Sequence, residues 1–328
     1  MVDHLKQGLY LSVGVTGHRD LVDDEIPVIE QHVKRFFEEL QRDFPELPVQ
    51  LITPLAEGGD QLAAEVALSM GISIVAVLPM VQAEYERDFT SVAELERFHN
   101  LLARSDETIV LPPVAGDMES PYSSHERALQ YAQLGVFQSD HCQVLLALWD
   151  GKLGANIGGT GHVVKYHLTG VMDGFEGDPT PAGLLADNEN DLVHHIVCSR
   201  NREDGEPKAG LDPLKAYWFS SRPEIGRSSE LPELYRELLQ KLRRFAQDWN
   251  EKPDIVRNHS NSLLENTPDL DLPSGSILTD KLFRVADGLA VHYQRRVVTS
   301  LRVLHSLAIL MGLVSVSYTH LTLPTTPY

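Results

Sequence analysis

The chain is poor in cysteine and in basic residues, and these shortages argue against a disulfide-rich protein and against a nucleic-acid-binding protein. Two cysteines, Cys142 and Cys198, stand in 328 residues. This is too few for a disulfide framework and is typical of a reducing compartment. Lys and Arg number 28 against 47 Asp and Glu, which gives a net charge of −19 at pH 7. Such a charge repels a phosphate backbone, so we expect no nucleic-acid partner.

The complete glycine fingerprints of nucleotide-binding proteins are also missing. The first glycine turn lacks the full G-x-G-x-x-G, and no glycine turn matches the P-loop pattern G-x-x-x-x-G-K-[ST]. What the chain has instead is a regular alternation of apolar runs and helical patterns. Apolar runs predict strands at 9–15, 49–55, 72–78, 108–111 and 142–149. We therefore expect an α/β fold with a doubly wound, parallel, Rossmann-like sheet and a C-terminal helical extension.

Helical spacing of apolar residues predicts the elements between these strands. The expected helices are 26–44, 61–70, 92–102, 121–136 and 160–168. Ser120 is the expected cap of the fourth helix, with Pro121 at its first position. Two more strands are expected, at 191–198 and, as an edge strand or a partner contact, at 215–219. His194 and His195 are adjacent on a strand and point to opposite faces, so we interpret them as ordinary core and surface histidines.

Three glycine turns follow predicted strands, and parallel strands bring such turns to one edge of the sheet. Glycine lets a backbone approach a ligand closely, and a helix N-terminus offers unpaired N–H groups to a phosphate. Arg19 can bind a phosphate through two parallel hydrogen bonds, with Thr16 and Thr160 as further donors. Asp60 or Asp150 can accept from a ribose hydroxyl. The candidate ligand-binding residues are Gly14, Thr16, Gly17, His18, Arg19, Glu57, Gly58, Gly59, Asp60, Asp150, Gly158, Gly159, Thr160, Gly161 and His162.

The motifs V-G-V-T-G-H-R-D-L at 13–21, P-L-A-E-G-G-D-Q-L-A-A-E at 54–65 and G-G-T-G-H at 158–162 resemble the SLOG superfamily. That superfamily contains the Lonely-guy phosphoribohydrolases, the DNA-processing protein A family and nucleotide-sensing domains of bacterial conflict systems. The resemblance covers roughly the first half of the chain. It implies a nucleotide-derived ligand, ADP-ribose-like or a cyclic nucleotide, with no required cofactor and no metal. It also implies a homo-oligomer.

Two functions follow from this resemblance, a ligand sensor and a hydrolase. The sensor would belong to a membrane-associated effector of the kind found in antiphage defence. The hydrolase would be a nucleotide N-glycosidase of Lonely-guy type, whose motif P-G-G-x-G-T-x-x-E ends in a catalytic Glu. This chain places Ile157, His162 and Lys165 at the proline, threonine and glutamate positions. A lysine cannot replace the carboxylate, so we favour the sensor, although Glu57 or Glu126 could supply an acid.

The C-terminal part predicts a membrane segment. A helical pattern starts at Ser276, and Arg295, Arg296 and Arg302 precede an apolar run of about fourteen residues, 303–316, shorter than the roughly 20 that span a bilayer. The basic flank is typical of a cytoplasmic side. The uncharged, Thr- and Pro-rich 317–328 resembles translated adapter sequence, so we expect a truncated gene whose authentic chain completes the span. The predicted divisions are 1–226 for the nucleotide-binding domain, 227–275 for a helix and linker, 276–316 for the helix into the membrane and 317–328 for the tail.

Overall fold

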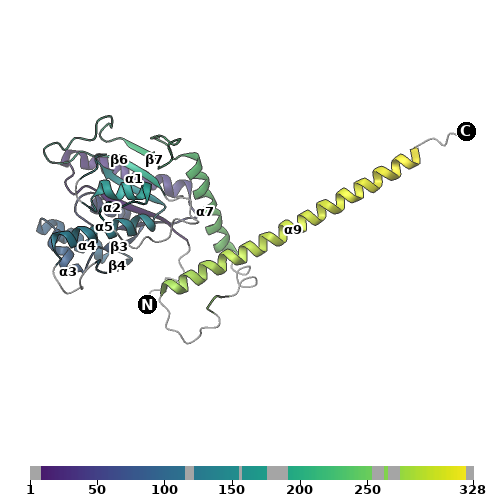
Figure 1. The fold of residues 1–328 in the computed structure, drawn as a ribbon, viewed down its shortest axis with the longest axis horizontal. Helices are drawn as coiled ribbons and strands as arrows, with labels where there is room; N and C mark the ends of the chain where they lie inside the picture. Colours follow the sequence, from purple (N-terminus) through teal and green to yellow (C-terminus); the bar gives the residue numbers. More distant parts are fainter. Residues whose placement is uncertain are drawn as a thin grey trace, which may run out of the picture. The chain divides into compact units, whose positions relative to one another are not determined.

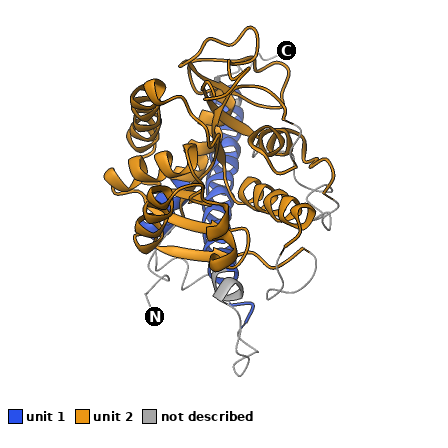
Figure 2. Cartoon of the chain, turned by 90° about the vertical axis from the view of Figure 1, so that its left-hand side faces the viewer, with its two compact units in different colours: residues 1–8, 244–328 blue, residues 9–243 orange. Residues whose placement is uncertain are grey.

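A computed structural model of the chain describes residues 9–114, 122–154, 157–175, 191–252, 262–264 and 274–322. The chain divides into two compact units (Figure 2). The first unit is 9–243, and the described part of the second lies within 244–322. The division falls inside one helix. The boundaries predicted from the sequence at 226, 275 and 316 stay predictions.

The first unit is built on a seven-stranded sheet in the order β4-β3-β2-β1-β5-β6-β7 (Figure 1). Strands β1 to β6 are parallel, and β7 pairs antiparallel with β6 at one edge. The predicted α/β, doubly wound sheet is therefore confirmed, with one antiparallel edge strand. The strands are β1 Leu11–Gly17, β2 Val49–Thr53, β3 Ser73–Leu78, β4 Glu107–Val110, β5 Val144–Trp149, β6 Leu192–Val197 and β7 Ala216–Phe219.

Helices cover both faces of this sheet. On one face, Leu134 of α5 packs with β2 and β3, and Val163 of α6 packs with β5. On the other face, Phe36 of α1 stacks on His194 of β6 with ring centroids 4.6 Å apart. Central strands buried on both faces explain the near-continuous apolar runs in the sequence. The helices of this unit are α1 Ile26–Asp43, α2 Gly59–Ser69, α3 Gln82–Tyr85, α4 Val92–Ala103, α5 Ser124–Asp140 and α6 Thr160–Thr169.

Three sequence predictions are wrong in detail. Helix α5 begins at Ser124, and its cap is Ser123, which forms a reciprocal capping box with Glu126. The predicted cap and first position, Ser120 and Pro121, lie outside the described residues. Helix α3 was missed because a four-residue helix leaves no apolar period. The sequence predicted that one of His194 and His195 lies at the surface, but both are buried in β6, which pairs with the edge strand β7.

Helix α7, Glu233–Glu251, crosses from the first unit into the second. Its buried side chains are those of Tyr235, Leu239 and Ala246, whereas Leu234 is 39% exposed. The Tyr235 hydroxyl donates a hydrogen bond to the buried carboxylate of Asp191. This contact ties the first turn of α7 to the start of β6.

Helix α9, Ser274–Thr322, is one unbroken helix in the second unit (Figure 1). Its segment Thr279–Thr319 is long and apolar enough to cross a membrane, with a mean hydropathy of 1.9 over its most apolar window, none of it buried. The helix continues past the predicted apolar run 303–316 into 317–322, which carries no charge. The uncharged helix is thus longer than the sequence pattern alone indicated.

Candidate functional site

The strand order places a topological switch between β1 and β5. From this pair the sheet extends through β2 in one direction and through β6 in the other. Ligands of open α/β sheets bind outside the carboxyl ends of the strands at such a point. The residues that follow β1 and β5 there are His18 and Asp150, and both are buried.

His18 and Asp150 tie the first and third turns together. The His18 amide donates to the Leu148 carbonyl at 3.1 Å, and the Asp150 amide donates to His18 Nε2, also at 3.1 Å. His18 Nε2 lies 3.1 Å from Asp150 Oδ1. Burial acts to raise the pKa of Asp150, but the His18 ring and the Lys152 amide outweigh it and lower that pKa. Asp150 is therefore an ionised carboxylate at the switch point.

The second turn packs directly on the first. The Gly59 amide donates to the His18 carbonyl at 3.0 Å. A Cβ on Gly58, whose φ is +79°, would lie 2.5 Å from the carbonyl oxygens of His18 and Arg19. A Cβ on Gly17 would lie 2.8 Å from the Cα of Gly59. These glycines serve the contact between two turns, whereas the sequence interpretation assigned them to contact with a ligand.

The N-terminal end of α6 joins the turns that follow β1 and β5. The Thr160 hydroxyl donates to the Gly17 carbonyl at 3.0 Å, and a Cβ on Gly161 would lie 2.8 Å from the Lys152 carbonyl oxygen. Gly158, with φ +76°, sits tightly against Ala132 of α5. The N-cap of α6 is Gly159, which has no side chain to accept from the first-turn amides. Those amides are the phosphate donors that the sequence predicts at this helix.

Arg19 is the exposed basic side chain of the group. Its Nη2 donates to the Tyr131 hydroxyl at 2.9 Å, and its Nη1 donates to the Asp88 carbonyl at 3.1 Å. Tyr131 in turn donates to Asp88 Oδ2 at 2.6 Å, and Arg127 pairs with the same carboxylate at 2.8 Å. Two of the five guanidinium N–H donors of Arg19 are thereby engaged, which fixes the plane of the group and leaves the others for a ligand.

The network around Arg19 was not predicted from the sequence. Asp88 and Arg127 belong to segments without a glycine turn, and Tyr131 lies inside α5. No local pattern marks such residues, because they meet Arg19 only after the sheet has formed. Burial raises the pKa of the Tyr131 hydroxyl, so that this hydroxyl stays protonated and donates to Asp88.

Three buried polar atoms at this edge have no hydrogen-bond partner among the described residues. They are Asp60 Oδ1, Asp150 Oδ2 and His162 Nδ1. Their residues are 5%, 1% and 7% exposed. Each such atom costs about 1–3 kcal/mol when it is left unpaired. Burial raises the pKa of Asp60 well above its ordinary value, against the opposing effects of Arg19 and the Gly17 amide.

The remaining candidates have structural partners or lie elsewhere. Gly14 is inside β1, where a Cβ would lie 2.9 Å from the Cys142 sulfur, so it is not at this edge. Cys142 is buried, and burial raises its pKa to about 12. Thr16 is buried at the end of β1. Glu57 accepts hydrogen bonds from the amide and the hydroxyl of Thr90.

The residues considered for hydrolysis at positions 126 and 165 also have partners in the structure, a hydrogen bond and an ion pair. Lys165 forms an ion pair with Asp173, and Glu126 accepts from the Ser123 amide in the capping box. His195 lies between the Trp149 carbonyl and Arg227, each 2.8 Å from a ring nitrogen. Across the part of the chain that the structure describes, no group of three or more His, Cys, Asp and Glu residues is arranged to hold a metal ion.

Comparisons with known proteins give similarity to solved structures but no match by sequence. No protein-family model matches the chain, and no curated protein does. The chain is similar to the X-ray structure of DNA processing protein A (DprA) from Streptococcus pneumoniae, with a TM-score of 0.29 and 16% sequence identity. The match covers 42% of this chain and 41% of that chain, so it spans less than half of either. A similarity this low adds no argument about the family of the chain or about what it binds.

Proposed function

We propose that this chain is a membrane-anchored domain that binds a nucleotide-derived anion at the β1–β5 edge. The observation that carries the proposal is the convergence of the three turns on one edge. There, Arg19 is held in a fixed plane after β1, and the N-terminus of α6, which no side chain caps, is joined to Gly17 of β1 through Thr160. A fixed guanidinium and first-turn amides together form an anion site. Such donors bind a small phosphate even on a chain with a net charge of −19.

The unpaired carboxyl oxygens favour a ligand that also carries hydroxyl groups. Among the described residues, Asp60 Oδ1 and Asp150 Oδ2 have no hydrogen-bond partner, and ribose hydroxyls next to a phosphate can accept from a protonated Asp60 and donate to the ionised Asp150. Inorganic phosphate would leave both oxygens unpaired. We therefore expect an ADP-ribose-like compound or a cyclic nucleotide to bind more tightly than phosphate alone, without any cofactor.

We assign the sensor role on the basis of α7, which belongs to both compact units. In the first unit, Arg236 Nη1 pairs with Asp43 of α1 at 3.2 Å. In the second unit, the Tyr293 hydroxyl of α9 donates to Asp248 of α7 at 2.7 Å, and the Lys281 ammonium lies 5.4 Å from the centre of the Trp249 ring. A shift of α7 caused by a ligand would reach α9 through these contacts. In this proposal the sheet unit is cytoplasmic, α9 is in the membrane and the assembly is a homo-oligomer.

A thermal shift assay on the full chain in neutral detergent tests the binding half of the proposal. The ligands are ADP-ribose, cyclic AMP, AMP and inorganic phosphate, each followed by chromatography of the ligand after incubation. We expect stabilisation by at least one nucleotide, weaker stabilisation by phosphate and no turnover. Absence of stabilisation by all three nucleotides would refute the site.

Hydrolysis of a nucleotide is the second candidate, and one observation favours it. The raised pKa of the buried Asp60 describes a carboxylic acid that can donate a proton, and Arg19 acts on it electrostatically. Release of free base from AMP, lost in Asp60→Asn, would establish this activity. Lys165→Glu is the companion variant, because gained hydrolysis there would mean that only the acid of the Lonely-guy motif was missing.

A further inference from the structure

The distal part of α9 has a charge opposite to that of the whole chain. From Gly288 to Tyr328 the sequence has no Asp and no Glu, whereas Arg295, Arg296 and Arg302 lie in this stretch. The whole chain carries −19. The proximal part of α9 differs, since Asp280 and Asp287 accompany Lys281 and Arg284 there. The three arginines therefore form a locally unbalanced cationic segment, which we name the arginine collar.

The collar directly precedes the uncharged part of the helix. From Val303 to Thr322, its last described residue, α9 has no charged side chain. The hydrocarbon core of a bilayer is about 30 Å thick and takes about 20 helical residues at about 1.5 Å each. Arg302 then lies at the boundary of that core. Arg295 and Arg296 lie about 10 Å further out, within the headgroup region.

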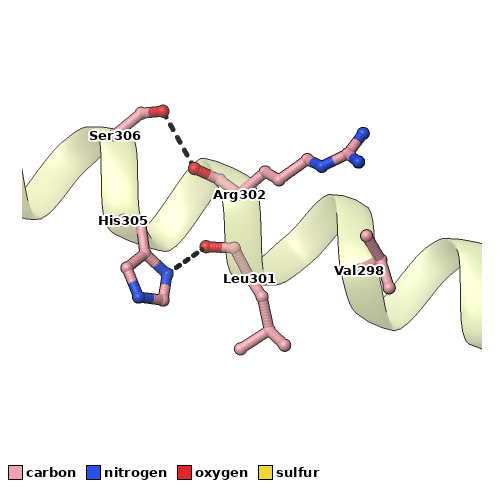
Figure 3. Close-up of a pocket in the computed structure, with 5 residues that line it drawn as sticks. All are labelled: Val298, Leu301, Arg302, His305 and Ser306. Atoms are coloured by element: carbon pink, nitrogen blue, oxygen red, sulfur yellow. Dashed lines mark hydrogen bonds between the residues drawn. The ribbon is translucent and has the colours of Figure 1, made fainter.

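The side chains at the boundary are arranged to keep charge out of the core. Figure 3 shows the Arg302 side chain extended along α9 toward Val298, which is the direction of the other two arginines. His305 Nδ1 donates to the Leu301 carbonyl at 2.8 Å, and the Ser306 hydroxyl donates to the Arg302 carbonyl at 2.9 Å (Figure 3). His305 Nδ1 and the Ser306 hydroxyl are thus bonded within the helix, while the Arg302 side chain extends toward its N-terminal end.

We propose that the arginine collar binds the headgroup phosphates of anionic phospholipids on the leaflet at the N-terminal side of the span. This inference rests on the membrane anchoring in the proposed function. Guanidinium groups bind phosphate through parallel hydrogen bonds, and three of them lie within eight residues of the helix here. An anionic leaflet attracts a basic segment next to a span by about fivefold in affinity for each residue near its surface. Three fully engaged arginines would give a preference of about a hundredfold over a zwitterionic lipid, and the attraction falls off within about 10 Å of the surface, so we take about tenfold as the smallest preference expected.

Native mass spectrometry of the full chain in neutral detergent tests this preference. The protein is incubated with equal amounts of phosphatidylglycerol and phosphatidylcholine of identical acyl chains, and the retained lipids are counted. The test variant replaces Arg295, Arg296 and Arg302 by Gln. The control variant replaces three exposed arginines of the sheet unit, Arg35, Arg104 and Arg202, by Gln, which changes the net charge equally.

We expect the unaltered chain and the control to retain phosphatidylglycerol about tenfold over phosphatidylcholine, and the collar variant to retain both equally. Equal retention by the unaltered chain, or an unchanged preference in the collar variant, would overturn the collar alone. An equal loss in both variants would assign the effect to net charge and would overturn it as well. A dimer that retains neither lipid would overturn the proposal too, because the collar would then contact a second copy of the chain. Retention of neither lipid by a monomer would refute both the collar and the membrane anchoring. It would leave the nucleotide site untouched, because nucleotide binding is measured in the same sample by thermal shift.

Discussion

Replacing Gly58 by alanine tests whether the first two turns are held together as described. Gly58 has φ +79° and ψ −118°, a conformation that side chains with a Cβ avoid. The added Cβ would also lie 2.5 Å from two backbone carbonyl oxygens, those of His18 and Arg19. Backbone strain of about 1–3 kcal/mol adds to a similar cost of overpacking, so we expect the free energy of unfolding to fall by about 4 kcal/mol.

Gly71→Ala is the matched control for this change. Gly71 also has a positive φ, +71°, but a Cβ there would have no atom within 4 Å. Only backbone strain remains, and the expected loss is about 1 kcal/mol. Urea denaturation of both full-length variants, followed by tryptophan fluorescence, measures the difference. Equal losses in Gly58→Ala and Gly71→Ala would refute the close contact between the turns.

Further predictions concern pH, the Arg19 network and the collar. The pKa values of His167, His194 and His195 are lowered by burial to about 4, about 3 and about 4. Because the unfolded chain binds their protons from pH 6.5 downward and the folded chain does not, stability should fall between pH 6.5 and 4, by roughly 2 kcal/mol per histidine at pH 5. Urea midpoints that stay level from pH 7 to 5 would contradict this. Tyr131→Phe removes one hydrogen-bond partner of Arg19 and should weaken nucleotide binding about threefold in calorimetry. A loss as large as that of deleting Arg19 itself would mean that Tyr131 contacts the ligand directly. In vesicles, the collar variant should also lose the dependence of flotation on phosphatidylglycerol content, whereas the control variant keeps it.

The sequence predicted the strands well because the central strands of the seven-stranded sheet are buried on both faces and need apolar runs. It located the candidate edge through glycines, although Gly17, Gly58 and Gly59 contact other turns rather than open space. It could not predict that Asp88 and Tyr131 would hold Arg19, since these residues are 69 and 112 positions away from it. Nor could it predict that His195 is buried, because that depends on the pairing of β7 with β6.

The N-terminal end of α5 shows that the same limit applies to neighbouring residues. Both Ser120 and Ser123 are suitable N-cap residues, and a proline follows the first of them. The structure uses Ser123, because Glu126 stands three positions later and closes a capping box. Local rules therefore offer alternatives, and a reciprocal contact decides between them.

The central claim is that Arg19 binds the anion of a nucleotide, and calorimetric titration of Arg19→Ala tests it most directly. The ligand is the nucleotide that stabilises the unaltered chain most, and Arg35→Ala, an exposed arginine on α1, is the control. Loss of a charge-assisted contact of about 1.5–3 kcal/mol predicts binding at least tenfold weaker in Arg19→Ala and unchanged in Arg35→Ala. Equal affinity in the two variants would contradict the account.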